Sequence, residues 1–278
     1  MMVEIGKYNN LEVVKDVDHG LYLDGGETYG EILIPNKYVF KETTVGDFID
    51  VFVYYDTEDR IIATTEMPYA MVGEFACLKA IEVNNIGAFL DWGLIKDLFV
   101  PFREQKMNMQ VNRYYVVHID VDEKSKRIVG TAKFDKFLDN VPHEYQVDQE
   151  VDVMVAGISE LGYTCIINGL HTGMLYMNEI FEKLHLGQKC TAYIKKLRED
   201  DKIDLYYHKK GLEGSEELSD IIMDRLDKNN GYMNIGDKSD SEDIYYEFAV
   251  SKKQFKKAIG HLYKQKLIKV EPTRIEKL

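Results

Sequence analysis

Hydrophobic and polar positions alternate with a period of two through most of this chain, and one arrangement of short apolar runs occurs three times. Each copy has a first apolar run, a polar break that ends in glycine, a second and a third run, and two final runs joined by an acidic turn. Short alternating runs separated by turn residues indicate a small β barrel or sandwich. About five strands in roughly 70 residues correspond to an OB-type barrel, and one long sandwich is the alternative.

A glycine opens the second run of each copy. The three glycines are Gly20, Gly87 and Gly162, which lie 87 − 20 = 67 and 162 − 87 = 75 positions apart. The third runs, at residues 32–35, 98–101 and 174–177, follow them at a nearly constant interval. We interpret the glycines as sites of the sharp bend that a tightly curved barrel requires.

From about Ser215 the apolar spacing changes to three and four residues, which predicts helices. The first helix ends at residues 229–231, the second is predicted to be capped by Ser239, and the third is predicted to begin at Ser251 and to run to about Lys266. Two short strands around Pro272 follow. Three helices and a hairpin are the order of a winged helix, a variant of the helix-turn-helix plan.

The predicted fold is therefore mainly β with α. It consists of three tandem five-stranded OB-type barrels followed by a winged-helix domain. We place the barrels at residues 1–66 (repeat one), 67–142 (repeat two) and 143–211 (repeat three), and the winged helix at 212–278.

Charge is distributed unevenly along the chain, whose net charge is 35 − 48 = −13. Repeat one has 5 basic and 14 acidic residues, a net charge of −9, so it is expected to repel phosphate and to serve packing, solubility or protein contact. Residues 251–278 have 9 basic and 2 acidic residues, an excess of +7. A polyanion is thus predicted to bind near the C-terminal end.

Outward-facing aromatic residues on the barrel strands are candidates for base stacking. If Ala88 and Leu90 point into the barrel, Phe89 points out, and the same reasoning exposes Tyr22 and Thr164. The stacking candidates are Phe89, Tyr22 and Tyr176, the last at the position that aligns with Ile34 and Val100. The alternative is that these rings pack between adjacent repeats. Trp92 and Phe99 are expected in a core or an interface.

Lysines and arginines of repeat three and of the third helix are candidates for phosphate contact. A polar helix face usually carries both signs of charge, whereas residues 252–266 hold six lysines and no acid. Lysines that guard a solvated strand edge are the alternative in repeat three. Together with Phe89 and Tyr176, the predicted RNA-binding residues are Lys195, Lys196, Arg198, Lys202, Lys252, Lys253, Lys256, Lys257 and Lys264.

The sequence also resembles known families. GAFL at 87–90 followed by DLFVP at 97–101 resembles the RNA-binding repeat of ribosomal protein S1, and residues 173–180 match its strand-three motif. Residues 236–239 and 251–264 resemble the winged-helix end of the bacterial conserved virulence factor B family. This resemblance implies a cytoplasmic bacterial RNA-binding protein that regulates other genes, without known catalysis.

No other chemistry is indicated by the sequence. There is no apolar window of the length that crosses a membrane, no export signal at residues 1–4, and no Gly-rich phosphate loop or nucleophile elbow. The three cysteines are too far apart for a CxxC site, and the triplet His118, Asp120 and Asp122 is interpreted as part of a strand and its turn. We predict no catalytic residue, no metal, no cofactor and a cytoplasmic location.

The predicted function is binding of single-stranded RNA, mainly by repeat three and the winged helix, in post-transcriptional regulation. Ribosomal or RNA-processing proteins are the other expected partners; a membrane and a small-molecule substrate are not expected. The alternatives are a winged-helix DNA-binding transcription regulator, an adaptor protein of the translation or RNA-decay machinery, and, as an enzyme, a nuclease.

Overall fold

The computed structural model describes residues 2–180, 183–207, 215–248 and 250–278. The chain forms two compact units, Met1–Pro142 with Gly169–His171, and His143–Asn168 with Thr172–Leu278. The predicted boundary between residues 211 and 212 lies outside the described residues, so the four domain limits stay predictions.

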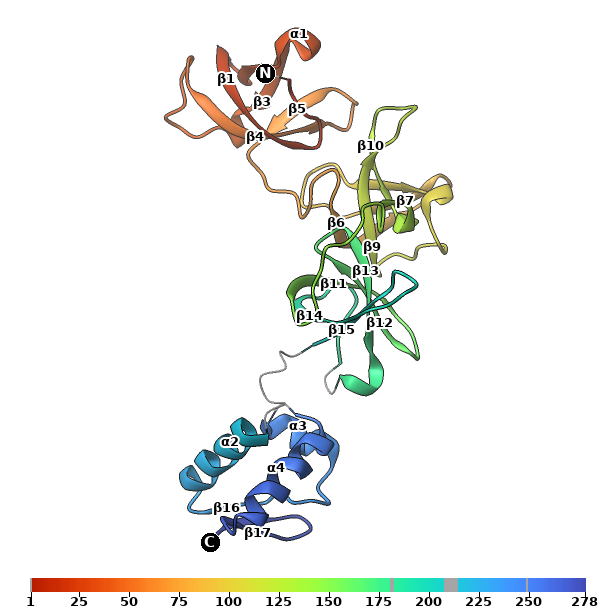
Figure 1. The fold of residues 1–278 in the computed structure, drawn as a ribbon. Coiled ribbons are helices and arrows are strands. Elements are labelled where there is room, and N and C mark those ends of the chain that lie inside the picture. Colours follow the sequence, from red (N-terminus) through yellow and green to blue (C-terminus); the bar gives the residue numbers. More distant parts are fainter. Residues whose placement is uncertain (1, 181–182, 208–214, 249) are drawn as a thin grey trace. The chain divides into compact units, whose positions relative to one another are not determined.

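Repeat one is a closed five-stranded barrel with the strand order β1-β2-β3-β5-β4 (Figure 1). The strands are β1 (Lys7–Val17), β2 (Gly20–Asp24), β3 (Glu31–Pro35), β4 (Phe48–Tyr55) and β5 (Ile61–Thr64). A one-turn helix, α1 (Gly26–Tyr29), and a 3-10 helix, η1 (Asn36–Tyr38), flank β3. Alternate strand residues such as Leu21, Leu23 and Ile34 fill the barrel.

Repeat two is a nearly closed barrel with the order β10-β9-β6-β7-β8. Its elements are β6 (Phe75–Val83), β7 (Gly87–Leu90), β8 (Leu98–Pro101), η2 (Phe102–Glu104), β9 (Tyr114–Val121), β10 (Ile128–Thr131) and η3 (Phe134–Phe137). The end strands β8 and β10 lie next to each other. Their closeness shows at Gly130 of β10, where an added Cβ atom would be only 2.8 Å from Val100 Cγ2 of β8.

Repeat three is again a closed barrel, in the order β11-β12-β13-β15-β14. Its elements are β11 (Glu150–Ile158), β12 (Gly162–Ile167), β13 (His171–Tyr176), η4 (Met177–Glu179), β14 (Lys189–Leu197) and β15 (Ile203–Tyr206). The prediction of three five-stranded OB-type barrels is confirmed.

The three repeated glycines are required for a reason other than the predicted bend. A Cβ atom on Gly20, Gly87 or Gly162 would lie 2.2, 2.4 or 2.1 Å from a carbonyl oxygen of the following strand. Only Gly162 also has a positive φ, of 152°. The absence of a side chain therefore lets the second and third strands approach each other closely at the same point in every barrel.

The C-terminal domain has the predicted winged-helix order. It contains α2 (Ser215–Lys228), β16 (Tyr232–Met233), α3 (Ser241–Phe248), α4 (Lys252–Lys264), β17 (Ile268–Val270) and β18 (Ile275–Lys277), with the sheet order β16-β18-β17. The helices enclose a core that includes Ile222, Phe255 and Leu262.

Two local features of this domain differ from the prediction. The short strand β16 completes the sheet and was not expected, because two residues are too few to show alternation. The predicted cap is also differently placed: α3 begins at Ser241, and the hydroxyl of Ser239 accepts the N–H of Gly236 at 2.8 Å.

Aromatic residues join repeats one and two within the first compact unit. On β4, Val51 and Val53 point into the first barrel, whereas Phe52 points out and is nevertheless fully buried. Phe52 packs edge-on against Trp92 of repeat two, with ring centroids 5.6 Å apart. The indole N–H of Trp92 donates to the Ala70 carbonyl at 2.7 Å. The expectation that Trp92 lies in a core or an interface is thus met.

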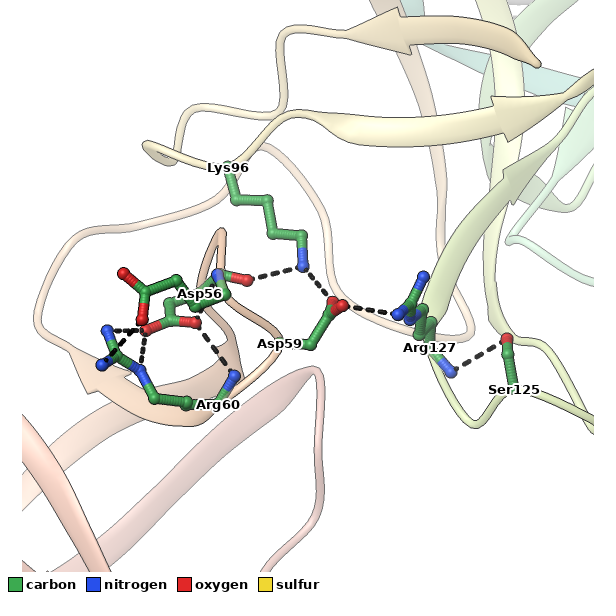
Figure 2. Close-up of polar contacts among 7 residues, drawn as sticks. Asp56, Asp59, Arg60, Lys96, Ser125 and Arg127 are labelled. Atoms are coloured by element: carbon green, nitrogen blue, oxygen red, sulfur yellow. Dashed lines mark hydrogen bonds and ion pairs between the residues drawn. The ribbon is translucent and has the colours of Figure 1, made fainter.

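A polar cluster also joins repeats one and two (Figure 2). The Lys96 ammonium of repeat two donates to Asp59 Oδ1 at 2.9 Å and to the Asp56 carbonyl at 2.6 Å, both in the β4–β5 turn of repeat one. Arg127, in repeat two, pairs with the other oxygen of Asp59. The hydrogen bond from Lys96 holds the pKa of Asp59 below its usual range, and the charges of Lys96 and Arg127 contribute. Asp59 therefore joins two cations of the neighbouring repeat.

Replacing Gly162 by alanine should destabilise repeat three. The new methyl group would overlap the Leu175 carbonyl oxygen, and we expect the free energy of unfolding to fall by roughly 2 kcal/mol or more. Gly157→Ala is the matched control in the same barrel, because its Cβ would have only ordinary contacts, the nearest at 3.6 Å. Urea unfolding followed by circular dichroism measures the difference. Equal stability of the two variants would contradict the close-approach explanation.

Phe52→Ala should separate repeats one and two at a cost of about 3–5 kcal/mol, the usual range for a buried phenylalanine. The chain has one tryptophan, so the fluorescence of Trp92 reports on this contact alone. We expect a red-shifted emission and a lower unfolding midpoint. Phe48→Ala, on the same strand at a ring that is 63% exposed, should leave both unchanged. Identical spectra for the two variants would argue against the proposed role of Phe52.

Acidification should loosen the same contact. Because the pKa of Asp59 is lowered in the folded chain, its contribution to stability is fully present above the unfolded pKa of about 3.9 and is lost as the pH falls below that value through the lower folded pKa. The Trp92 indole N–H should lose protection over that range, measured as its exchange rate relative to the intrinsic rate at the same pH. Asp59→Asn should already exchange faster at pH 7 and respond less to acid. Glu58→Gln, in the same turn but paired with Arg60, should behave like the wild type; a full acid response in Asp59→Asn would refute the assignment.

Candidate nucleic-acid interface

Helix α4 separates an apolar face from a lysine face. Ser251 and Gln254 form a capping box that fixes its first turn, as predicted. Positions three and four residues apart share a side of a helix, so Phe255, Ala258, Ile259 and Leu262 are buried together. The opposite side presents the five lysines of the helix, Lys252, Lys253, Lys256, Lys257 and Lys264.

These five lysines have no acidic partner among the residues that the structure describes. Within the described ranges, none of their ammonium groups forms an ion pair, and only Lys252 is half-buried while the other four are exposed. Lys266, just beyond the helix, is likewise exposed. Since like charges without counter-ions attract a polyanion, this face is suited to phosphate groups.

Cations of the wing are neutralised locally. Lys269 pairs with Glu271 at 2.7 Å, Arg274 pairs with Glu276 at 2.8 Å, and Lys277 pairs with Asp227. The Arg274 guanidinium also lies 4.5 Å from the centre of the Tyr232 ring. The positive excess of this domain is thus concentrated on α4.

Most of the predicted cations of repeat three also have carboxylate partners. Lys195 pairs with Glu179, Lys202 with Asp200 at 2.8 Å, and Arg198 with Asp204 at 3.7 Å. Lys196 is exposed, and no ion pair involves it among the residues that the structure describes. Phosphate contact in repeat three would therefore compete with existing ion pairs.

The alignment of the third strands differs by one residue from the prediction. The sequence aligned Tyr176 with Ile34 and Val100, whereas the structure aligns Leu175 with them. Gly162 faces the Leu175 carbonyl, just as Gly87 faces Val100 and Gly20 faces Ile34, so Leu175 is the inward residue and Tyr176 faces outward. The Tyr176 hydroxyl donates to Asp204 at 3.0 Å, and this hydrogen bond raises its pKa. Its ring remains half-exposed, with the Lys195 ammonium 5.8 Å from its centre.

Phe89 lies on the outer surface of repeat two, as predicted. It is paired across the strands with Phe99, which was expected in a core, and the two half-exposed rings are 5.1 Å apart. Glu82 is opposite Phe89 on β6, and burial together with the charges of Asp91 and Glu82 raises the pKa of Asp97 nearby. This aromatic pair therefore has carboxylates among its neighbours.

Tyr22 is the equivalent outward ring of repeat one. It is half-exposed beside the Lys15 ammonium, which lies 5.4 Å from the ring centre. All three predicted stacking candidates thus face out of their barrels, and the contact between repeats one and two is made by Phe52, Tyr54 and Trp92 instead.

Comparisons with known proteins agree with this architecture. Residues 220–276 match the CvfB-like winged helix domain, and residues 5–66 match the S1 domain. The predicted resemblance to the conserved virulence factor B family is confirmed. OB folds and helix-turn-helix variants are nucleic-acid-binding architectures.

Relatives resemble this chain over most of its length. The Bacillus subtilis protein YitL, described as uncharacterized, is 25% identical and aligns with 93% of this chain and 89% of its own length. Conserved virulence factor B of Staphylococcus epidermidis is 23% identical over 98% of this chain and 94% of its own length. A Streptococcus pneumoniae structure, titled a multidomain protein with nucleic acid binding domains, is 24% identical with a TM-score of 0.44, covering 99% of this chain and 98% of that one.

The metal-like triplet of the sequence is a structural feature. His118 is buried between Phe137, whose ring centroid is 3.8 Å away, and Phe75, and burial lowers its pKa. Asp122 accepts the N–H and the hydroxyl of Ser125 in the following turn. Among the described residues, no group of three histidine, cysteine or acidic side chains is arranged to hold a metal, and no helix there is long and apolar enough to span a membrane.

Proposed function

We propose that this chain binds single-stranded RNA through phosphate contacts on the lysine face of α4 and base stacking on the outward rings of its barrels. The observation that carries the proposal is the contrast in ion pairing. The lysines of α4 have no acidic partner among the described residues, whereas Lys195, Arg198, Lys202 and the cations of the wing are paired.

Contact with phosphates is favoured over reading of base edges in a DNA groove. Recognition helices read guanine with arginine or lysine and adenine with asparagine or glutamine, and α4 has no arginine and no asparagine. On α4, Gln254 is bound to Ser251 in the capping box, and the Gln265 amide just beyond the helix lies 2.9 Å from His261 Nε2. The remaining charged groups are ammonium ions, which contact phosphates as point charges.

Single strands are favoured by the barrels. Stacking on an aromatic ring requires an unpaired base, and single-stranded RNA can splay its bases out. Phe89 with Phe99 offers a double ring surface in repeat two, and Tyr176 offers a ring beside Lys195 in repeat three. Carboxylates around these rings leave the phosphate contacts to α4.

The biological role that fits such binding is post-transcriptional regulation in the cytoplasm of a bacterium. Conserved virulence factor B is the name of several relatives, and a gene-regulatory role for this chain is part of the proposal. Acidic repeat one is proposed to contact protein partners, such as those of the ribosome or of RNA processing, rather than RNA.

Changing Lys252, Lys253, Lys256 and Lys257 to glutamate should weaken binding of a labelled single-stranded RNA by about 100-fold or more at low salt. The slope of log affinity against log salt should fall by about 3, since each phosphate contact on a single strand contributes roughly 0.7. Fluorescence anisotropy titrations at several salt concentrations measure both quantities, and an equal length of duplex DNA serves as competitor.

The control carries the same change of charge at the other end of the chain. Lys7, Lys15, Lys37 and Lys41 of repeat one, changed together to glutamate, alter the net charge equally and should leave the affinity within about threefold. Equal weakening by both quadruple variants would mean a nonspecific charge effect and would defeat the proposal. Preference for the duplex competitor would favour a DNA-binding regulator instead.

A further inference from the structure

A glycine stands in the interior of α4 without a packing reason. Gly260 destabilises a helix interior relative to alanine, because its backbone loses more freedom on folding. A Cβ atom at this position would meet nothing within 4 Å. No neighbouring element of the described structure therefore requires the missing side chain.

Gly260 lies at the centre of the lysine face. Residues three and four positions away are its neighbours on the helix surface. They are Lys256, Lys257, Tyr263 and Lys264, three cations and one aromatic ring. The helix backbone at Gly260 is thus not covered by a side chain, and ammonium groups lie on both its N-terminal and its C-terminal side.

Tyr263 is the aromatic member of this ring of neighbours. Its side chain is 60% exposed, and no ring contact or cation–π contact involves it within the described part of the chain. Helical side chains lean toward the N-terminus and cover the preceding turn, which directs this ring toward the turn that contains Gly260. The sequence analysis did not include Tyr263 among the candidates, although its position three residues after a mid-helix glycine places both on the same side of the helix.

We propose that this surface, made of Gly260 with Lys256, Lys257, Tyr263 and Lys264, is a seat for an unpaired nucleotide. The base stacks on Tyr263, and its phosphate lies over the bare backbone at Gly260, where a side chain would hold it away from the three ammonium groups. Coulomb attraction grows as the distance shortens, so close approach strengthens each contact. The proposal rests on the proposed function and adds that α4 itself distinguishes single strands from duplexes.

A second copy of this chain is a poorer occupant of the same surface. Two identical α4 faces would bring like charges together, and within the described residues this face has no carboxylate to compensate them. A duplex keeps its bases stacked internally and offers Tyr263 no free base face.

The test uses the full chain with Tyr263→Ala, Tyr263→Phe, Gly260→Ala and Gly260→Leu. The probes are a short labelled uridine oligomer and an RNA duplex of the same length. Tyr263→Ala should weaken oligomer binding by about tenfold, the effect of losing one stacked base, and should leave the duplex affinity within about twofold. Tyr263→Phe should bind like the wild type. The salt slope should be unchanged in the two Tyr263 variants, because their phosphate contacts remain, and should fall in Gly260→Leu, whose side chain holds the phosphate away from the lysines.

The glycine variants test whether the phosphate approaches the helix backbone at Gly260. Gly260→Ala should slow hydrogen exchange of the α4 amides by about fivefold, as a better helix former, yet weaken oligomer binding about threefold. Gly260→Leu should weaken it further. A more stable helix that binds less tightly separates a lost contact from misfolding.

Tyr246→Ala is the matched control, because Tyr246 on α3 is 92% exposed and lies outside the lysine face. If Tyr263→Ala and Tyr246→Ala bind the uridine oligomer with equal affinity, the proposed nucleotide site at Gly260 is wrong. The quadruple lysine-to-glutamate variant still tests the proposed function separately. Equal losses on oligomer and duplex would also overturn the proposed nucleotide site. A change of oligomeric state by sedimentation in Gly260→Leu, with RNA binding intact, would assign the surface to protein contact instead.

Discussion

The close approach of the second and third strands fixes each barrel of this chain. At Gly20, Gly87 and Gly162 the carbonyl of the neighbouring strand occupies the space of a side chain, so the two strands can be joined in one register only. A shift of one residue would exchange the inward and outward faces. The same constraint thus decides that Leu175 fills the core of repeat three and that Tyr176 faces solvent.

Repeats one and two share a second set of contacts with a different physical basis. Phe52 extends from the outer side of β4, and its burial against Trp92 gives the two barrels a common apolar cluster. Asp59 then pairs with both Lys96 and Arg127. The apolar contact supplies most of the stability, because exposed ion pairs contribute little on their own, while the charges fix which turns meet.

An acidic chain tends to satisfy its cations with its own carboxylates, and most of the predicted binding residues of repeat three follow this rule. Helix α4 departs from it, since its apolar face needs four buried positions and its opposite face carries lysines without an acidic residue. A high excess of acid elsewhere does not abolish attraction at this face, because screening confines each charge to a range of about 10 Å. Local arrangement of charge, rather than the net value of −13, therefore governs what the chain can bind.

Sequence by itself determined the barrels, the winged helix and the lysine face, because each is encoded by a period: two for strands, three to four for helices. The four consecutive apolar residues 51–54 of β4 also indicate that this strand is buried on both faces. Only the tertiary structure decided which cations are paired, that Phe99 lies beside Phe89, and that Gly260 has open space around it. The Lys195–Glu179 pair and the Phe89–Phe99 pair join residues distant in sequence. Even the pairs between near neighbours, such as Lys202 with Asp200, depend on turn geometry that no hydrophobic period records.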